Sequence, residues 1–119
     1  MQNYLAIYTA TDASRTRSGW AALSEEEVNA RRAAGVEAWN AWVETHRSAI
    51  VDHGAPIGKT KRAEAGGLSD GANTIAAYTI VRADSHDAAA RMFENHPHFT
   101  IFPGEAVEIM PCLPLPRAS

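Results

Sequence analysis

Apolar positions along the chain follow two different spacings, and these separate predicted strands from predicted helices. Four short runs are rich in branched and aromatic apolar residues, which is typical of strands. Between residues 24 and 49 the apolar positions instead recur every three or four residues, as on one face of a helix, and a shorter helical pattern covers 85–95. The predicted strands are residues 3–9, 50–57, 74–82 and 106–110.

Polar residues at the ends of the two helical patterns indicate where the helices begin and end. Ser24 is a favoured N-cap residue, and Glu27, three positions later, completes a capping box. Ser85 is expected to cap the second helix, and Pro97 is expected to end it. Gly35 lies inside the first helix and costs about 1 kcal/mol relative to alanine, which makes a kink or break there possible.

Three segments have no clear periodicity. Residues 10–22 are expected to form a polar loop anchored by Trp20. Residues 58–73 are polar and rich in glycine, and we expect an arm there, either a hairpin or a mobile loop. Because a structureless loop of that length is unusual, some strand is expected near 61–65. Residues 111–119 form an extended tail whose prolines favour a polyproline-like path.

The order strand, helix, strand, arm, strand, helix, strand predicts an α+β fold. It is the order of a ferredoxin-like split β-α-β protomer with an antiparallel sheet. Two helices can cover one face of a four-stranded sheet, yet the strands at 3–9 and 74–82 are apolar on both faces. Since soluble monomers rarely expose a large apolar patch, we predict a homodimer that packs sheet against sheet. The alternative is a monomer whose second face is covered by the arm and the tail.

Composition narrows the class of protein. The chain has 119 residues, 45% of them hydrophobic, which suits a single domain covering residues 1–119. A net charge of −3 argues against nucleic acid as the main partner. Cys112 is the single cysteine, which excludes an internal disulfide or a cysteine zinc site and suits a reducing cytoplasm. The first residues lack the pattern of a signal peptide, and no apolar run is long enough to span a membrane.

His96 and His98 form the tightest cluster of groups that can titrate near neutral pH. In extended geometry, residues on either side of Pro97 project to the same side, so that the two imidazoles could share a ligand. The simpler interpretation is that His96 caps the C-terminus of the preceding helix as a cation, while His98 is partly buried and hydrogen-bonded. Of the two, His98 is the better catalytic candidate.

Asp52 and His53 precede Gly54, where the backbone can pass close to a ligand. Adjacent residues of a strand face opposite ways, so only one of them can enter a given pocket. His53 has a suitable pKa for a general base without tuning, and its alternative role is that of a surface histidine. A metal at the histidine pair would need a third ligand from Asp52, His53 or Glu105, and we expect no metal and no organic cofactor.

Other residues allow a structural and a functional interpretation. Glu37 is expected to be a solvated helix charge; turned inward, it would need a partner such as Arg82 or a histidine. The simplest interpretation of Trp39, Trp42 and Tyr78 is that they are core or interface residues. The alternative is that they line an aromatic pocket.

A small basic group, Lys59, Lys61 and Arg62, is expected on the arm. It predicts either a solvated edge that discourages aggregation or an anion-binding lid. Cys112 has no neighbouring base in the sequence and is not expected to be a nucleophile.

Motifs over nearly the whole chain resemble the YCII-related family of the dimeric α+β barrel superfamily. Most of the resemblance lies in the second half, in LSDGANTIAAYTIVRADSHDAAARMFENHPHF (68–99) and GEAVEIMPC (104–112). In the first half it rests on YLAIY (4–8), LSEEE (23–27), Trp39, Trp42 and HGAPIG (53–58).

This resemblance implies a ferredoxin-like protomer, a homodimer and a pocket in each protomer between helices and sheet, near the dimer interface. It implies no single reaction. A histidine that some members carry in the middle of the first helix falls near Glu37 here, and the aspartate that accompanies it has no clear equivalent in 59–64.

Two functions are therefore expected from different classes. The first is a small cofactor-independent enzyme that uses histidine acid/base chemistry on a small aromatic or carbonyl-bearing molecule, with His98, His53 and Asp52 as catalytic candidates. The second is a non-catalytic small-molecule-binding or regulatory module. A histidine that pairs with a carboxylate and faces a concave pocket favours the enzyme, whereas histidines bonded only to backbone favour the module.

Overall fold

The computed structural model describes residues 1–116. Its elements are β1 (Gln2–Thr9), α1 (Asp12–Ser18), a 3-10 helix (Trp20–Ala22), α2 (Glu25–His46), a second 3-10 helix (Arg47–Ala49), β2 (Ile50–Asp52), β3 (Thr60–Glu64), β4 (Gly67–Gly71), β5 (Ile75–Ala83), α3 (His86–Arg91), α4 (Pro97–Thr100) and β6 (Ala106–Pro111).

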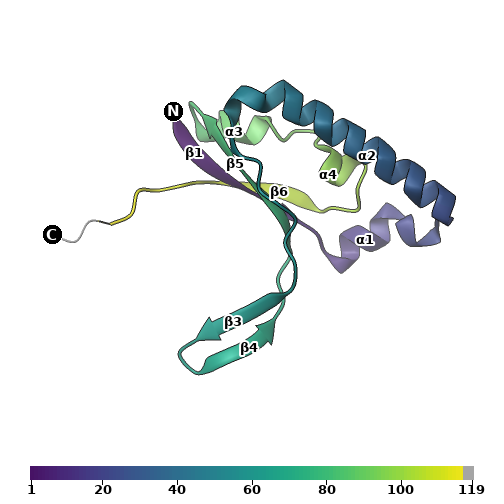
Figure 1. Ribbon diagram of the computed structural model, residues 1–119, viewed down its shortest axis with the longest axis horizontal. Helices are drawn as coiled ribbons and strands as arrows, with labels where there is room; N and C mark the ends of the chain where they lie inside the picture. Colours follow the sequence, from purple (N-terminus) through teal and green to yellow (C-terminus); the bar gives the residue numbers. More distant parts are fainter. Residues whose placement is uncertain (117–119) are drawn as a thin grey trace.

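One sheet contains four strands in the order β2-β5-β1-β6, and each neighbouring pair is antiparallel. In this order β1 lies between two strands from the second half of the chain, and α2 crosses from β1 to the parallel strand β2 at the far edge (Figure 1). This is the strand order of a ferredoxin-like protomer, and the predicted α+β fold class is confirmed.

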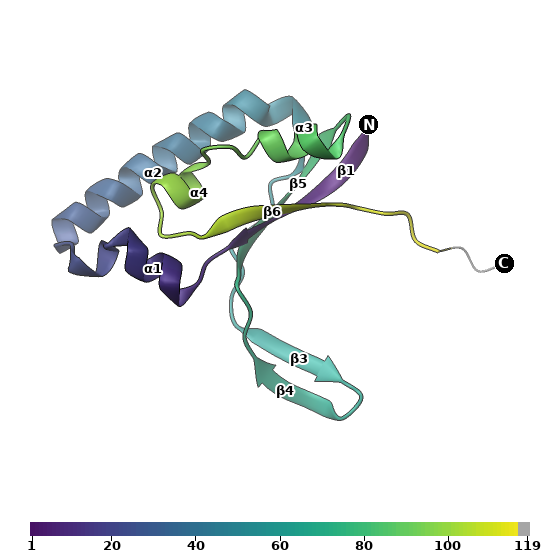
Figure 2. The ribbon, with the colours of Figure 1, turned by 180° about the vertical axis from the view of Figure 1, so that it is seen from behind.

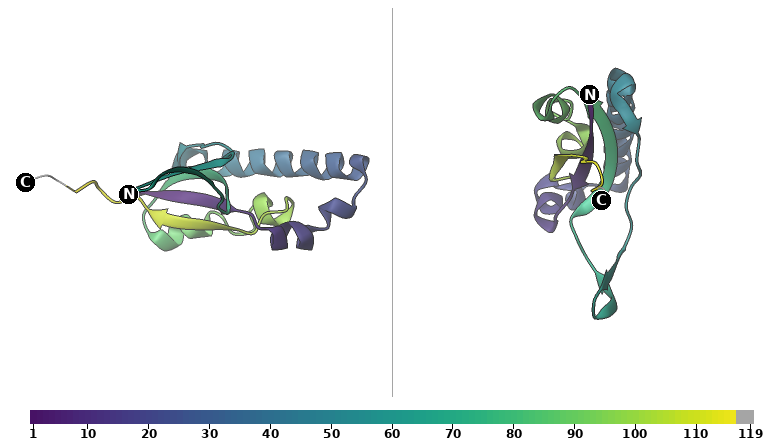
Figure 3. Two further views of the ribbon diagram at one scale, coloured as in Figure 1. Left: turned by 90° about the horizontal axis from the view of Figure 1, so that it is seen from below. Right: turned by 90° about the vertical axis from the view of Figure 1, so that its left-hand side faces the viewer.

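The helices α2, α3 and α4 lie on one face of the sheet (Figure 1), and α2 extends beyond the strands when the molecule is seen from below (Figure 3). On the covered face the register places Tyr4 opposite Val81 and Ala6 opposite Thr79, and all four side chains are buried. Together with Tyr8, which is also buried, these residues form the floor of the core beneath the helices.

The opposite face of the sheet carries a second apolar surface, which we call the open face. Leu5 pairs with Ile80 and Ile7 pairs with Tyr78 on this side, because alternate residues of a strand point to opposite faces. All four side chains are only partly exposed, and Met110 lies opposite Leu5 on the neighbouring strand. The prediction that these strands are apolar on both faces agrees with this arrangement.

The long helix α2 begins with the predicted capping box: Ser24 accepts from the Glu27 amide, and the Glu27 side chain accepts from the Ser24 amide. It runs without a break through Gly35, so the possible kink is absent. Gly35 has a packing role instead. A Cβ there would lie 2.4 Å from the Phe102 ring, so the missing side chain lets Phe102 approach the helix.

The expectation of a polar loop at residues 10–22 is wrong. Thr11 caps α1 in a second capping box with Ser14, and Gly19 ends that helix with a φ of 72°. The 3-10 helix that follows brings Trp20 to 5.9 Å from the Phe102 ring, measured between centroids, so Trp20 does anchor the segment. A helix this short and polar leaves no hydrophobic period in the sequence.

The second predicted helix is also divided differently. Ser85 caps α3 as expected, but α3 ends at Arg91, and turns lead to Asn95, whose φ is 57°. Pro97 then occupies the first turn of α4, a position that proline favours because it lacks an amide hydrogen. The proline therefore opens a new helix rather than only closing the old one.

The arm at residues 58–73 is a two-stranded hairpin, β3 and β4, that projects away from the sheet on the side opposite the helices (Figures 1 and 2). Residues 61–73 are all exposed, and Leu68 has 83% of its surface accessible. The arm projects on the side of the open face but stands away from the sheet, and residues 112–116 of the tail run on beyond the end of β6 (Figure 1). Within residues 1–116, no helix has both the length and the apolar character needed to cross a bilayer.

Candidate functional site

His96 and His98 lie inside a cluster of aromatic side chains between the sheet and α2. The His96 ring lies 4.5 Å from the Trp39 ring and 5.2 Å from the Tyr8 ring, measured between centroids, and the Trp39 contact is edge-to-face. The His98 ring lies 5.2 Å from the Tyr8 ring. Side-chain burial is complete at His96 and nearly so at His98, which has 7% of its surface accessible.

His96 does not cap a preceding helix as a cation, because it is the N-cap of α4. Its Nδ1 accepts a hydrogen bond of 3.0 Å from the backbone amide of His98, so a neutral ring carries its proton on Nε2. Nε2 is buried and has no hydrogen-bond partner among the described residues. Burial, reinforced by His98 and His46, lowers the pKa of His96 to about 3, which keeps the ring uncharged at neutral pH.

His98 has the same tautomer but uses its two ring nitrogens differently. Its Nε2 lies 2.7 Å from the carbonyl oxygen of Thr9, and because a carbonyl only accepts, Nε2 must carry the proton. Nδ1 is then unprotonated, and it has no partner within residues 1–116. Burial lowers the pKa of His98, against the opposing effect of the Thr9 hydrogen bond. Gly104 makes room for this ring, since a Cβ there would lie 2.3 Å from Nε2.

His98 lines an open cavity of about 480 Å³ between α2, β5 and the segment that follows β2, which is the size of ordinary small-molecule sites. Its lining contains no lysine, arginine, aspartate or glutamate. The lining residues are Tyr8, Val36, Trp39, Asn40, His53, Gly54, Ala55, Pro56, Ala76, Ala77, Tyr78, Thr79, His98 and Phe102.

A short chain of hydrogen bonds fixes the polar side chains at the inner wall. The Thr79 hydroxyl donates to the carbonyl oxygen of His53 at 3.2 Å, so it can only accept from Tyr8, whose hydroxyl lies 3.1 Å away. The hydroxyl proton of Tyr8 is therefore directed at Thr79. Burial raises the pKa of Tyr8 to about 12, and the phenol stays neutral over the ordinary pH range.

The structure brings two of the three predicted catalytic residues to this cavity. His98 and His53 both line it, although His53 is exposed at the rim. Asp52 is not part of the lining: its carboxylate accepts from the Gly54 amide at 2.8 Å. Gly54 has a φ of 71°, and a Cβ there would lie 1.7 Å from the Tyr78 carbonyl oxygen, so glycine alone lets this segment approach β5.

The aromatic residues divide between the core and the cavity. Trp39 and Tyr78 line the cavity, whereas Trp42 belongs to the core and donates its indole N–H to the Met92 carbonyl at 2.7 Å. Glu37 is exposed, as expected for a solvated helix charge, and lies on a neighbouring groove of α2 rather than in the cavity.

Sequence reasoning missed three contributors, Tyr8, Asn40 and Phe102. The Tyr8 position was visible as an apolar strand residue, but no local motif marks Asn40 or Phe102 as lining a cavity.

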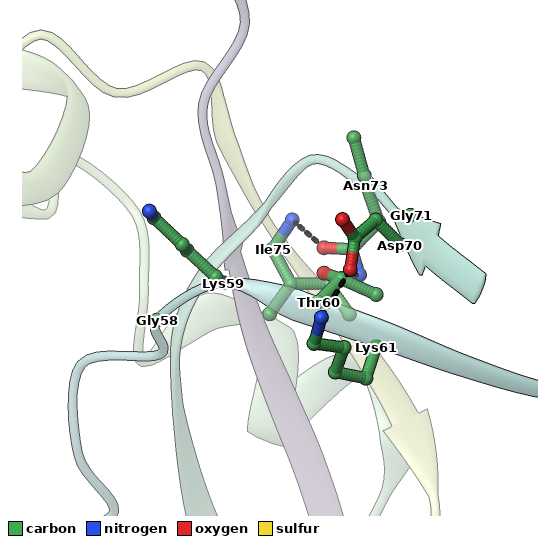
Figure 4. Close-up of a pocket in the computed structure, with 9 residues that line it drawn as sticks. Gly58, Lys59, Thr60, Lys61, Asp70, Gly71, Asn73 and Ile75 are labelled. Carbon is green, nitrogen blue, oxygen red and sulfur yellow. Dashed lines mark hydrogen bonds and ion pairs between the residues drawn. The ribbon is translucent and has the colours of Figure 1, made fainter. Parts of the chain in front are cut away.

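A second cavity, of about 450 Å³, lies at the base of the arm (Figure 4). Its polar groups pair with one another: Lys61 with Asp70, and Asn73 with Thr60 at 3.0 Å. In Figure 4 the Lys59 side chain points away from this group. Since Arg62 pairs with Glu64 at 3.4 Å, the basic group is largely neutralised within the arm. This favours the solvated edge over the anion-binding lid.

Within residues 1–116, no group of three or more histidine, cysteine, aspartate or glutamate side chains is placed to hold a metal ion. Glu105, considered as a third ligand for the histidine pair, instead accepts from Thr11 at 3.0 Å and from Arg17 at 2.9 Å. Cys112 is exposed near the end of β6 and lies outside the cavity lining.

No protein-family model matches the chain, and no curated protein matches it by sequence. Among solved structures it is similar to the 5-chloro-2-hydroxyhydroquinone dehydrochlorinase TftG of Burkholderia phenoliruptrix AC1100, determined as a complex with 2,5-dihydroxybenzoquinone. The match has a TM-score of 0.52 and 16% sequence identity, and it covers 91% of this chain and 90% of that one. The likeness supports the α+β fold. Membership of the YCII-related family itself stays a prediction.

Proposed function

We propose that the cavity beside His98 binds a small molecule and that His98 removes a proton from it as a general base. The observation that carries this proposal is the unprotonated Nδ1 of a neutral histidine that lines a cavity without charged residues. In this step the proton moves from the bound molecule to Nδ1, and the electron pair stays on the molecule. The lowered pKa of His98 keeps it in the basic form at neutral pH.

The other two candidates have supporting roles in this proposal. His53 stands at the rim, where its imidazole can exchange protons with solvent and contact the outer part of a ligand. Asp52 acts as a positioning residue rather than a reacting one. Its carboxylate accepts a hydrogen bond from the Gly54 amide and so holds the tight turn that contains His53. No organic cofactor or metal is part of the proposed chemistry.

The solved structure similar to this chain adds support of a coarser kind. That protein is named as a dehydrochlorinase and was determined with a small hydroxylated quinone. At 16% identity its reaction cannot be transferred, but a protein of the same fold that processes a small ring makes a small-molecule enzyme a reasonable expectation here.

One observation favours a non-catalytic binding module instead. His98 bonds to the backbone of Thr9 and to no carboxylate among the described residues, so nothing of opposite charge stabilises an imidazolium once it forms. An enzyme was expected to have a histidine that both faces a concave pocket and pairs with a carboxylate. His98 meets the first condition, which favours the enzyme, but not the second, which favours the binding module.

Turnover by a His98→Gln variant separates these two functions. The assay follows chloride release from 5-chloro-2-hydroxyhydroquinone, and deuterium uptake from solvent by its unchlorinated counterpart. If His98 is the base, the variant loses about 100-fold or more in kcat/KM. His86→Gln, at an exposed histidine outside the cavity, is the matched control and keeps full activity. Binding of these compounds without any turnover by the wild type would favour the module.

We also propose that the protein is a homodimer that buries the open face. Within residues 1–116 the arm stands away from that face and the tail runs on beyond it, and Leu5, Ile80 and Met110 form a continuous apolar row across three strands. Sedimentation at micromolar concentration is expected to give a dimer, and Leu5→Lys is expected to give a monomer. Glu37→Lys, on the exposed side of α2, is the matched control and stays dimeric. A monomeric wild type would refute the assembly.

A further inference from the structure

Three side chains at the inner wall of the cavity direct their protons into the protein. Thr79 donates to the carbonyl oxygen of His53, Tyr8 therefore donates to Thr79, and His98 donates from Nε2 to the carbonyl oxygen of Thr9. Each assignment follows because a carbonyl oxygen accepts and never donates. What remains for a ligand is the lone pair on His98 Nδ1, because Tyr8 has no accessible surface.

The inner wall can therefore accept hydrogen bonds but cannot offer them. The opposite tautomer of His98 is disfavoured, because it would place the Nε2 lone pair 2.7 Å from the Thr9 carbonyl oxygen. Rotation of the ring is also restricted, since the Cα of Gly104 passes so close that even a methyl group would collide with it. The polarity of this wall is fixed before any ligand arrives.

The charge and shape of the cavity further restrict the kinds of ligand that it can bind. A buried charge without a partner is costly, and no charged side chain lines the cavity. Trp39 and Phe102 supply flat aromatic surfaces, which favour a ring in offset or edge-to-face contact. The side-chain donors in the lining are Asn40 and His53, which are both exposed, and the indole N–H of Trp39.

We propose that this cavity selects an uncharged ring that carries a hydroxyl group, which donates its hydrogen bond to His98 Nδ1. A carbonyl or carboxylate at the same place would face the Nδ1 lone pair and be rejected, because buried polar groups left unpaired are penalised. The inference rests on the proposed function and sharpens it: of the aromatic or carbonyl-bearing molecules expected from the sequence, it selects those whose inward end is a hydroxyl. In this arrangement the hydroxyl proton of the ligand points at His98 Nδ1, which is the atom that would remove it.

The test compares four ligands that share one ring system: naphthol, its methyl ether, the corresponding aldehyde and the corresponding carboxylate. Dissociation constants are measured for each by titration calorimetry, and in the wild type the ring resonances of His98 are also followed in protein with isotopically labelled histidine. Naphthol is expected to bind about tenfold more tightly than the ether or the aldehyde, a difference of about 1.4 kcal/mol. The carboxylate is expected to bind most weakly.

One variant assigns the selectivity to His98. His98→Gln replaces the fixed lone pair by an amide that can also donate, and it is expected to reduce the preference for naphthol to about twofold or less. His86→Gln is the control and keeps the preference. Equal or tighter binding of the aldehyde or carboxylate by the wild type would overturn the inference and leave the proposed cavity intact. No change at His98 with any of the four ligands would refute both.

Discussion

His96 and His98 are separated by a single proline, yet their surroundings have opposite consequences. The first is enclosed by aromatic rings, accepts one hydrogen bond and leaves a buried N–H without a partner. The second is held by a backbone carbonyl on one side and lines a cavity with the other. A pair of neighbouring histidines thus contains one group that shapes the fold and one that is available for chemistry. Both carry their proton on Nε2, and what separates them is which nitrogen is hydrogen-bonded: Nδ1 in His96 and Nε2 in His98.

The largest effect that would test this contrast between His96 and His98 is expected in the pH dependence of stability. The pKa of His96 is about 3 in the folded protein and near 6.5 when unfolded, so as pH falls below 6.5 the unfolded chain takes up a proton that the folded chain refuses. Stability is therefore lost on acidification, by about 2 kcal/mol from His96 alone between about pH 8 and pH 5.

His96→Asn keeps an acceptor for the helix start but cannot titrate. We expect this variant to be less stable at about pH 8 because it leaves a cavity, and to lose about 2 kcal/mol less than the wild type on acidification. Urea unfolding at one fixed protein concentration measures both quantities. An unchanged pH slope would mean that His96 is protonated or solvated in the folded state.

A pair of glycine variants is expected to produce the next largest effect. At Gly104 a methyl group would lie 2.4 Å from the backbone oxygen of His98, which cannot move without shifting α4, so Gly104→Ala is expected to cost about 2 kcal/mol and to disturb the cavity. At Gly35 the obstacle is the far end of the Phe102 ring, which can turn aside.

Gly35→Ala also gains about 1 kcal/mol of helix propensity, so its net change in the free energy of unfolding is expected to be within about 1 kcal/mol. Thermal unfolding of the two variants and the wild type, at matched concentration, gives the comparison directly. Equal losses would argue that the Gly104 loop is more adaptable than its packing indicates.

The smallest effect is expected at the rim. His53 is exposed and its ring makes no hydrogen bond among residues 1–116, so His53→Gln is expected to change the free energy of unfolding by less than about 0.5 kcal/mol. If the cavity binds as proposed, the same variant weakens ligand binding by a few-fold at most, because glutamine retains a donor and an acceptor. Titration calorimetry with naphthol measures that change. A loss of affinity comparable to that of His98→Gln would indicate that His53 at the rim, rather than His98, is the main contact of the ligand.

The fold was predictable from sequence because its signals are local and repeated. The strands at 3–9 and 74–82, the capping box at Ser24 and the apolar stripe of the long helix each agree with the structure. The segments that were mispredicted, 10–22 and 91–100, form helices of a few residues, whose caps decide their conformation and leave no period to detect.

The site was predictable only in part, for a related reason. His98 was recognisable as a candidate, but its tautomer depends on the carbonyl of Thr9, which is 89 positions away in the chain. Likewise, Asp52 looked reactive by type, and only the turn geometry at Gly54 shows that its carboxylate is occupied by a backbone amide. Residue type indicates the chemistry that is available, whereas long-range partners decide which atom can perform it.

The central place of β1 in the sheet has a consequence for how the chain folds. Both of its neighbours, β5 and β6, come from the last half of the sequence, so β1 and α2 leave the ribosome long before either partner strand exists. Such non-local pairing slows folding and leaves apolar strands unpaired in the meantime. The loop that carries Gly104 immediately precedes β6, so the pocket for the His98 ring cannot close before this part of the chain has been synthesised. The geometry around His98 therefore depends on one of the last-made elements of the sheet.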